Sequence, residues 1–352
     1  MQARDAHGCR RSIEVRIGQR SRQTTAPEAT LIEAARAGDE KAFESLVAPY
    51  RRALHAHCYR MLGTLADSED AVQDSMLRAW RGLAGFDGRS SLRNWLHRIA
   101  TNASLDVIAH RGRSPVLLAE QGPPTAEAWD PETRKETEVL WLQPLPDEGY
   151  ERREGVELAF IAALEHLSPN QRAALIMREV LGFSAREVAE VMTTSEPSVK
   201  SALQRARARL DERVPNRSQQ ETLRALGDTR VQMIVRNYAD AFERGDVDGL
   251  VSMLADHAEW SMSPYSLWYS GRDAIRQLLA TGPAKEGWRH RFTSANGQPA
   301  VGCYRWDARR AAFVADGIDV LTLDDDGRIL AMTALLDPAL FARFGLPERI
   351  DS

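Results

Sequence analysis

Cysteine is scarce in this sequence, and long apolar runs are missing. The three cysteines, Cys9, Cys58 and Cys303, are scattered, and none belongs to a CxxC pair. This pattern argues against a disulfide framework or a zinc site and favours reduced thiols. No apolar run is long enough to cross a bilayer, and the N-terminus lacks the apolar core of a signal peptide. We therefore expect a soluble, cytoplasmic protein that does not bind membranes and carries no cofactor.

A large excess of positive charge is also missing. The formal net charge of the 352-residue chain is −4, so any contact with nucleic acid has to come from local basic clusters. Hydrophobic residues make up 43% of the chain, which is enough to form sizeable cores. The length predicts roughly two or three domains rather than one.

Changes in composition divide the chain into segments. Residues 1–27 are rich in arginine without apolar periodicity, which predicts a flexible basic tail. Residues 28–113 follow a helical pattern throughout, and residues 155–214 follow a second one. Between them, residues 114–154 are interrupted by prolines and carry more acidic than basic side chains, which predicts a linker. Residues 221–352 form a third domain of different character.

The first helical segment contains several helix boundaries. Gly38 and Asp39 predict the end of one helix and the N-cap of the next. Another helix is expected to open at Asp67, and a further one near Ser90 or Ser91. Apolar residues recur at three- and four-residue steps within each helix, which predicts a compact helical bundle.

The second helical segment contains the most informative motif. The stretch from Leu167 to Leu210 reads as two short amphipathic helices joined by a polar turn. Its sequence is LSPNQRAALIMREVLGFSAREVAEVMTTSEPSVKSALQRARARL. Ser184 should cap the first, and the second should run from Ser195 or Glu196 to Leu210. The second helix is basic, which is typical of the recognition helix of a DNA-binding helix-turn-helix.

The C-terminal segment predicts an α+β domain. Residues 229–254 read as a helix, and alternating, aromatic-rich stretches follow. Asp326 and Gly327 lie between two strand-like runs and predict a hairpin. Titratable and aromatic side chains gather in this domain: Asp256, His257, Trp260, Tyr265, Trp268, Tyr269, Trp288, His290, Arg305, Trp306 and Asp319. A pocket with a His/Asp acid–base pair is one interpretation. We favour the other, a packed domain that binds a protein partner, the linker or a small ligand.

Two stretches carry a family resemblance. The first runs from Asp67 to Asp106 and reads DSEDAVQDSMLRAWRGLAGFDGRSSLRNWLHRIATNASLD. It resembles region 2 of the extracytoplasmic-function group of bacterial sigma-70 factors. The helix-turn-helix resembles region 4 of the same family, and the C-terminal domain resembles the SnoaL-like (NTF2-like) extension of larger members. The resemblance implies a multidomain chain with two all-α domains, the region 2 bundle and the region 4 helix-turn-helix, followed by an α+β NTF2-like cone.

The resemblance also implies partners and contact residues. Core RNA polymerase is the expected partner, through its β′ clamp and β flap, together with promoter DNA. The expected polymerase-binding residues are Asp70, Gln73, Asp74 and Arg78. Trp80 and Trp95 fall on apolar stripes, so core packing is the better interpretation for both.

Promoter DNA should contact both helical domains. The −10 strand is expected to meet Arg89, Arg93, Asn94, Arg98 and Asn102. For the −35 element, base contacts are expected from the start of the recognition helix and phosphate contacts from its later arginines. These −35 residues are Glu196, Ser198, Lys200, Ser201, Gln204, Arg205 and Arg207. Many family members have arginine where this chain has Ala202, which puts the −35 preference in question.

We therefore predict a non-catalytic sigma factor that gives core polymerase its promoter specificity and is regulated by its C-terminal domain. Trp141–Asp147, in the linker, is a candidate docking surface for that domain. Two alternatives stay open: a ligand-responsive helix-turn-helix regulator, and an NTF2-like enzyme fused to a DNA-binding module. Such a regulator has no need of the Asp67–Asp106 bundle, and a ligand bound to the isolated C-terminal domain would favour the enzyme.

Overall fold

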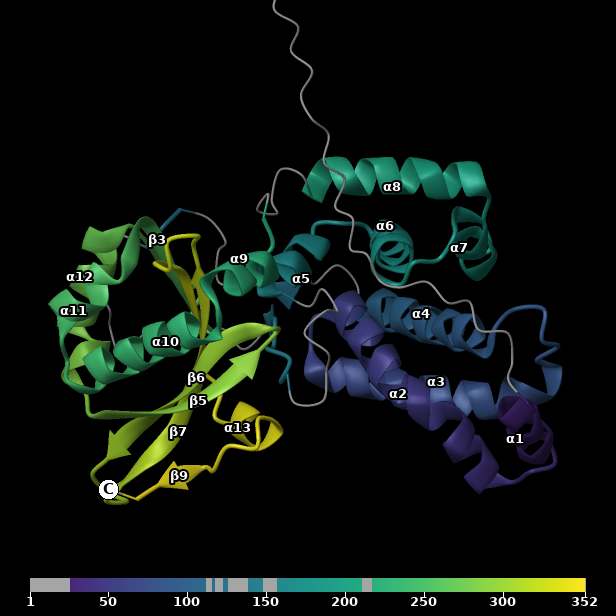
Figure 1. Cartoon of the computed structure of the whole chain (residues 1–352), viewed down its shortest axis with the longest axis horizontal. Coiled ribbons are helices and arrows are strands. Elements are labelled where there is room, and N and C mark those ends of the chain that lie inside the picture. The colour runs from purple at the N-terminus through teal and green to yellow at the C-terminus, as the bar shows by residue number, and fades with distance from the viewer. Residues whose placement is uncertain are drawn as a thin grey trace, which may run out of the picture.

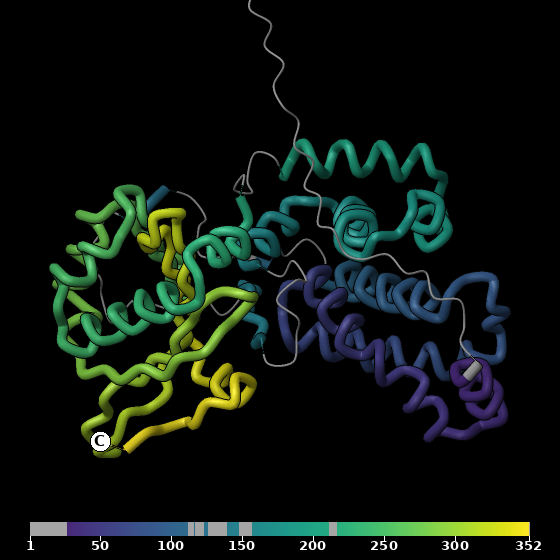
Figure 2. The backbone as a smooth tube through the Cα atoms, in the orientation of Figure 1, coloured from purple at the N-terminus to yellow at the C-terminus, as the bar shows by residue number. Residues whose placement is uncertain are grey.

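The computed structural model describes residues 26–111, 116–117, 123–125, 139–147, 157–210 and 217–351. Almost all of the expected basic tail and much of the expected linker therefore lie outside the described residues. Figures 1 and 2 show three bodies, which we name the N-terminal bundle (26–111), the helix-turn-helix domain (157–210) and the C-terminal domain (217–351). No helix in the described ranges has the length and apolar character needed to span a membrane.

Four helices form the N-terminal bundle: α1 (Ala26–Arg36), α2 (Glu40–Leu62), α3 (Leu65–Gly82) and α4 (Leu92–Arg111). The predicted N-cap is confirmed, because the Asp39 side chain accepts from the backbone N–H groups at the start of α2. Gly63 ends α2 at φ 72°, a left-handed conformation that glycine adopts without strain. The predicted start of α3 at Asp67 is wrong. Thr64 is the N-cap, and Asp67 lies in the first turn.

The helix-turn-helix domain follows the predicted pattern. Its helices are α5 (Leu158–Leu164), α6 (Pro169–Leu175), α7 (Ala185–Val191) and α8 (Glu196–Leu210), with a π-helical turn at Ile176–Val180. Ser184 caps α7 as expected, and Glu187 completes a capping box by accepting from the Ser184 N–H. An equivalent box joins Ser168 and Gln171 at α6. Two polar turns therefore fix where α6 begins and where α7, the helix that braces the recognition helix α8, begins.

The C-terminal domain is a sheet with most of its helices on one face (Figure 1), while its last short helix packs on the opposite face. Its helices are α9 (Gln219–Leu226), α10 (Asp228–Glu243), α11 (Val247–Ser252), α12 (Arg272–Thr281) and α13 (Leu340–Arg343). Its strands are β3 (Leu254–Ser263), β4 (Leu267–Ser270), β5 (Trp288–Ala295), β6 (Gln298–Asp307), β7 (Ala312–Leu323), β8 (Ile329–Leu335) and β9 (Arg349–Ile350). The strand order is β4-β3-β8-β7-β6-β5, with β9 paired to β7.

Two details of the predicted C-terminal domain can be checked. The expected hairpin at Asp326 and Gly327 is confirmed, since these residues join the antiparallel strands β7 and β8. The single helix expected over residues 229–254 is wrong. Gly245, at φ 65°, separates α10 from α11, and Leu254 already belongs to β3. The helical periodicity continued across the break because both helices bury one face on the same sheet.

Linker residues lie between the N-terminal bundle and the C-terminal domain. A short parallel pair joins β1 (Val116–Leu117) to β2 (Leu140–Trp141). Leu142 and Leu145 are 1% exposed and belong to an apolar cluster that includes residues of both helical domains and one face of the sheet. The linker also meets the sheet at both edges: the Thr125 N–H donates to Trp268 O at 2.7 Å, and Pro146 bridges to Ala295. One apolar cluster therefore extends through all three bodies, and a second lies within the C-terminal domain.

Candidate nucleic-acid interface

The recognition helix α8 presents a basic, hydrophilic face to solvent. Val199, Leu203, Ala206 and Leu210 are its buried positions. All seven residues predicted for −35 contact are exposed: Glu196, Ser198, Lys200, Ser201, Gln204, Arg205 and Arg207. Figure 1 shows α8 lying along the outer side of its domain, away from the N-terminal bundle. The exposed face of α8 can therefore approach a DNA groove without any change in the fold of the domain.

Both arginines predicted for −35 contact already have partners within the domain. Arg205 Nη1 donates to Ser201 Oγ at 2.6 Å, a local contact on the same exposed face. Arg207 pairs with Glu179 at 2.5 Å. Because the Arg207 side chain is 57% exposed, solvent screens this pair and its contribution to stability is small. A phosphate can therefore displace Glu179 at little cost.

The residues predicted for −10 contact divide into two groups. Arg89, Arg98 and Asn102 are exposed. Arg89 pairs with Asp87 at 2.5 Å, and hydrogen bonds from the Arg89 backbone and side chain lower the pKa of Asp87. This local pair holds the Arg89 guanidinium beside its own loop.

Arg93 and Asn94 are instead covered by the helix-turn-helix domain. Arg93 Nη2 donates to Leu181 O at 2.9 Å, and its guanidinium lies 5.2 Å from the centre of the Phe183 ring. Asn94 Nδ2 donates to Glu187 Oε1 at 2.6 Å. Burial lowers the pKa of Arg93. Sequence periodicity could not reveal this, because the covering residues lie about ninety positions away in the chain.

A second contact locks the two helical domains together. Arg172 of α6 is 5% exposed and donates to Met61 O at 2.7 Å and to Glu165 Oε1 at 2.5 Å. Glu165 belongs to the same domain as Arg172, while Met61 lies in the last turn of the long helix α2. The guanidinium therefore satisfies a carbonyl of the N-terminal bundle while its own charge is compensated within the helix-turn-helix domain.

On α3, the predicted polymerase-binding residues form two neighbouring sites. Asp70 and Gln73 are exposed. Arg78 bridges Asp74 and Asp106, each at 2.7 Å, and both carboxylates raise its pKa, Asp106 through the stronger hydrogen bond. Asp106 had not been predicted as part of this site. Asp106 lies on α4, 28 residues from Arg78, and no pattern in the sequence links the two residues.

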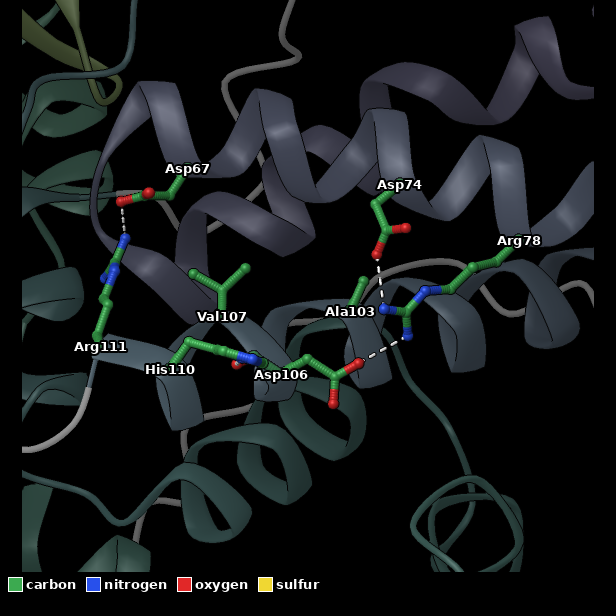
Figure 3. Close-up of a pocket in the computed structure, with 8 residues that line it drawn as sticks. All are labelled: Asp67, Asp74, Arg78, Ala103, Asp106, Val107, His110 and Arg111. Carbon is green, nitrogen blue, oxygen red and sulfur yellow. Dashed lines mark hydrogen bonds and ion pairs between the residues drawn. The ribbon is translucent and has the colours of Figure 1, made fainter.

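These side chains line a shallow pocket of about 480 Å³ between α3 and α4. Figure 3 shows Arg78 reaching across it from α3 toward Asp106, with a separate Asp67–Arg111 pair at the opposite end. The lining residues are Asp67, Asp74, Arg78, Ala103, Asp106, Val107, His110 and Arg111. Charged groups of both signs make this a surface suited to a polar protein partner rather than to an apolar ligand.

Leu77 is a further surface residue that the sequence interpretation missed. It is 55% exposed and lies on α3 one turn beyond Gln73, off the buried stripe. An exposed leucine alone is unremarkable, but this one lies beside the polar residues already singled out. The signal in the sequence was a large apolar residue outside the helical periodicity.

The C-terminal domain separates the candidate acid–base residues. Asp256 and His257 are exposed, and Asp256 pairs with Arg272 at 2.9 Å. Arg305 is half-exposed and pairs with Asp316 at 3.1 Å. These residues therefore do not form the interior acid–base pair that was one interpretation of the sequence.

His290 and Asp319 lie inside the cone. Asp319 is 4% exposed and accepts from Tyr238 OH at 2.8 Å. Burial raises the pKa of Asp319. The Phe242 ring packs edge-on against His290, at 5.4 Å between ring centres. Of the predicted aromatic residues, Trp260, Tyr269 and Trp288 are buried, whereas Tyr265 and Trp268 are partly exposed and Trp306 is 40% exposed. Ring packing thus occupies the part of the interior around His290.

The segment Trp141–Asp147 contacts both the bundle and the sheet. Tyr59 OH donates to Gln143 O at 2.7 Å. Asn296 Oδ1 accepts from the Leu145 N–H at 2.8 Å, while Asn296 Nδ2 donates to Tyr59 OH at 2.9 Å. Tyr59 and Asn296 are both 0% exposed. The three parts of the chain thus meet at one buried hydrogen-bonded junction.

Known families match all three bodies. The description "Sigma-70 region 2" matches residues 46–114, "Sigma-70, region 4" matches residues 157–210, and "SnoaL-like domain" matches residues 235–332. The chain is 43% identical over 321 residues to the ECF RNA polymerase sigma factor SigG of Mycobacterium tuberculosis, covering 88% of this chain and 85% of that protein. It is 33% identical over 183 residues to SigM of the same species, covering 52% of this chain and 82% of that protein.

A solved structure shares the overall architecture. The crystal structure of the Mycobacterium tuberculosis extracytoplasmic function sigma factor SigJ matches 86% of this chain and 99% of its own, with a TM-score of 0.52. Sequence identity over the match is 22%, so this likeness concerns the fold alone. Two helical domains followed by a helix-backed sheet are thus an arrangement already seen in another chain.

Proposed function

The chain belongs to the extracytoplasmic-function group of sigma-70 factors, which direct transcription initiation, and we propose from this how its parts divide the work. The N-terminal bundle reads the −10 strand and holds core polymerase. The helix-turn-helix domain reads the −35 element. The C-terminal domain controls when the two helical domains are available, and the chain performs no chemistry of its own.

The exposed face of α8 carries the −35 proposal. Glu196, Ser198 and Lys200 lie at the helix start, where side chains reach base edges in the major groove. Arg205 and Arg207 lie further along and suit phosphates. Ala202 is partly exposed on the same helix, and it cannot make the polar contact that an arginine would make there.

The −10 proposal requires a change in domain arrangement. Arg89, Arg98 and Asn102 are exposed and ready for a single strand. Arg93 and Asn94 become available only when Leu181 and Glu187 move away. The arrangement described here is therefore a closed state, and promoter binding on polymerase requires its opening.

Polymerase docking is proposed for the outer face of α3. Asp70, Gln73 and Leu77 are exposed on it, and Asp74 with Arg78 forms its edge. The partner surface is the β′ clamp, with the β flap contacting the helix-turn-helix domain. A central apolar side chain surrounded by polar ones is the usual composition of a protein interface.

Regulation by the C-terminal domain rests on two contacts. The Asn296 junction ties the sheet to α2 through Tyr59. Arg343 of α13 pairs with Glu69, the residue directly before Asp70 on α3. A domain held there lies beside the proposed polymerase-docking face. Because the domain is tethered, even weak contacts act at high effective concentration.

Transcription in vitro tests the function as a whole. Purified chain and core polymerase are incubated with a pool of genomic fragments, and the start sites are mapped. We expect initiation at a restricted set of promoters that share −35 and −10 sequences. A variant with Lys200→Ala and Arg205→Ala, which keeps the fold, should lose that selection. If core polymerase initiates identically with and without the chain, the proposal is wrong.

A further inference from the structure

Two histidines lie side by side where the helix-turn-helix domain covers the N-terminal bundle. His57 of α2 and His97 of α4 are both 0% exposed, and their ring centres are 5.6 Å apart. Phe183 of the covering domain packs edge-on against His97, at 5.7 Å between ring centres. Met177 Sδ lies 4.0 Å from Thr101 Oγ1, the hydroxyl that His57 contacts. Residues of both domains thus enclose this histidine pair.

Each imidazole uses its single proton in one hydrogen bond. His97 Nδ1 donates to Arg93 O at 2.8 Å. Thr101 Oγ1 gives its own proton to His97 O at 2.7 Å, so it accepts from His57 Nε2 at 2.9 Å. The remaining nitrogens, His57 Nδ1 and His97 Nε2, are buried without a hydrogen-bond partner among the described residues. A second proton on either ring would therefore have no acceptor, which is a costly arrangement.

The charges around the histidine pair also oppose protonation. Arg60 of α2 and Arg93 of α4 act on both rings. From the covering domain, Arg178 donates to Phe183 O at 2.8 Å, and Glu187 faces Arg93 rather than either imidazole. Burial is the largest cause, and with these cations it holds the pKa of His57 well below its ordinary value and lowers the pKa of His97 to about 3.

We propose that the histidine pair is a proton-sensitive latch between the two helical domains: they dock when both rings are neutral, and acid separates them. Separation exposes Arg93 and Asn94, the two proposed −10 residues that docking covers. The latch itself depends only on the contacts between the domains. Its consequence for transcription rests on the proposed function.

The direction of the pH effect follows from proton linkage. In separated domains the imidazoles meet water and approach an ordinary pKa of about 6.5. The docked form has lower pKa values and so binds fewer protons than the separated form. Docking is therefore favoured above about pH 6.5 and weakens as the pH falls below it. At about pH 5.5 the shift toward separation is up to about tenfold for one histidine and about 100-fold for both.

Distances between two spin labels in the full chain test the latch. Labels at Ser90→Cys and Thr194→Cys, in a chain that also carries Cys9→Ser, report the separation of the domains. Both positions are exposed, while Cys58 and Cys303 are buried. We expect one docked distance at about pH 7.5 and a growing longer-distance population as the pH is lowered to about 5.5. A chain that stays fully docked at the lower pH overturns the proposal.

Substitutions test whether His57 and His97 are the groups that make domain separation depend on pH. His57→Gln with His97→Gln removes both titrating rings, and its distance distribution should no longer respond to pH. His110→Gln is the matched control, since His110 is exposed on the same helix as His97, and it should respond like the parent. A double glutamine variant that still opens with acid, as the parent does, contradicts the latch.

Histidine resonances of the unsubstituted chain give an independent measurement, which holds even if the double variant fails to dock. His57 and His97 should titrate together with the change in distance. Titration of either ring near pH 6.5 while the domains stay docked contradicts the proposal. Both measurements are made on the chain alone, without polymerase or DNA. A failed latch therefore leaves the promoter function intact, and a working latch without transcription overturns the promoter function alone.

Discussion

Asn296 illustrates how one side chain can join three parts of a chain. It is 0% exposed, its amide contacts Leu145 and Tyr59, and its backbone has a φ of 56°. Asparagine tolerates this left-handed conformation better than most residues. Both the amide hydrogen bonds and the left-handed backbone conformation therefore favour asparagine at position 296.

Asn296→Ala should lower the thermal midpoint of the full chain. The substitution leaves the buried Leu145 N–H without its partner, at a cost of about 1–3 kcal/mol, and it places alanine in a left-handed conformation. Asn296→Gly removes the same hydrogen bonds without the backbone strain, so it should lose less stability. Asn237→Ala, at an exposed position of α10, is the control and should change little. Equal midpoints for all four chains would show that the junction contributes nothing.

Arg78→Ala should weaken polymerase association without unfolding the bundle. Arg78 holds two carboxylates together, and its removal leaves Asp74 and Asp106 without their shared cation. The three side chains are 41–53% exposed, so the effect on stability should stay below about 1 kcal/mol. Titration of labelled core polymerase should show roughly fivefold weaker binding. Arg51→Ala, exposed on α2, should bind normally. A normal affinity for Arg78→Ala would remove this residue from the docking site.

At the scale of elements, the caps decide where the helices begin. Asp39, Ser168 and Ser184 each accept from backbone N–H groups of the helix that follows. These are local interactions between residues three positions apart or fewer, which is why sequence inspection finds them. The predicted start of α3 at Asp67 is wrong because Thr64 occupies the N-cap position without a side-chain cap bond, and Asp67 lies within the first turn.

Salt dependence tests the recognition helix α8. Arg205→Ala and Arg207→Ala should each reduce the slope of log affinity against log salt for a −35 duplex by about 1, because each removes one phosphate contact. Both residues are exposed, so thermal midpoints should not change. Arg186→Ala, on the exposed side of the brace helix α7, serves as the control. An unchanged slope for both α8 variants would contradict the proposed contact face.

At the scale of the molecule, the shared core argues against removing the C-terminal domain as a clean test of regulation. Deleting residues 221–352 would expose apolar residues of the linker and the bundle that now pack against the sheet. Loss of activity after such a deletion would not distinguish misfolding from lost regulation. A change confined to a surface contact is more informative.

Arg343→Glu should raise promoter-specific transcription. The substitution turns the Glu69–Arg343 ion pair into a repulsion beside the docking face of α3. Both side chains are more than a third exposed, so the contact contributes at most about 1 kcal/mol, or about fivefold in activity. Glu69→Arg combined with Arg343→Glu should restore the parental level relative to Glu69→Arg alone. Additive effects of the two substitutions would contradict a direct contact.

The sequence by itself determined the elements and the family of this protein. Helix caps, apolar stripes and the basic face of α8 depend on neighbours within a few positions, and the order of the region 2 and region 4 stretches pointed to the sigma-70 resemblance. Only the tertiary structure decided which of those surfaces are available. The covering of Arg93 and Asn94, the Asn296 junction and the burial of His57 and His97 each join residues far apart in the chain. Such contacts depend on packing between domains, and no local pattern of residues encodes them.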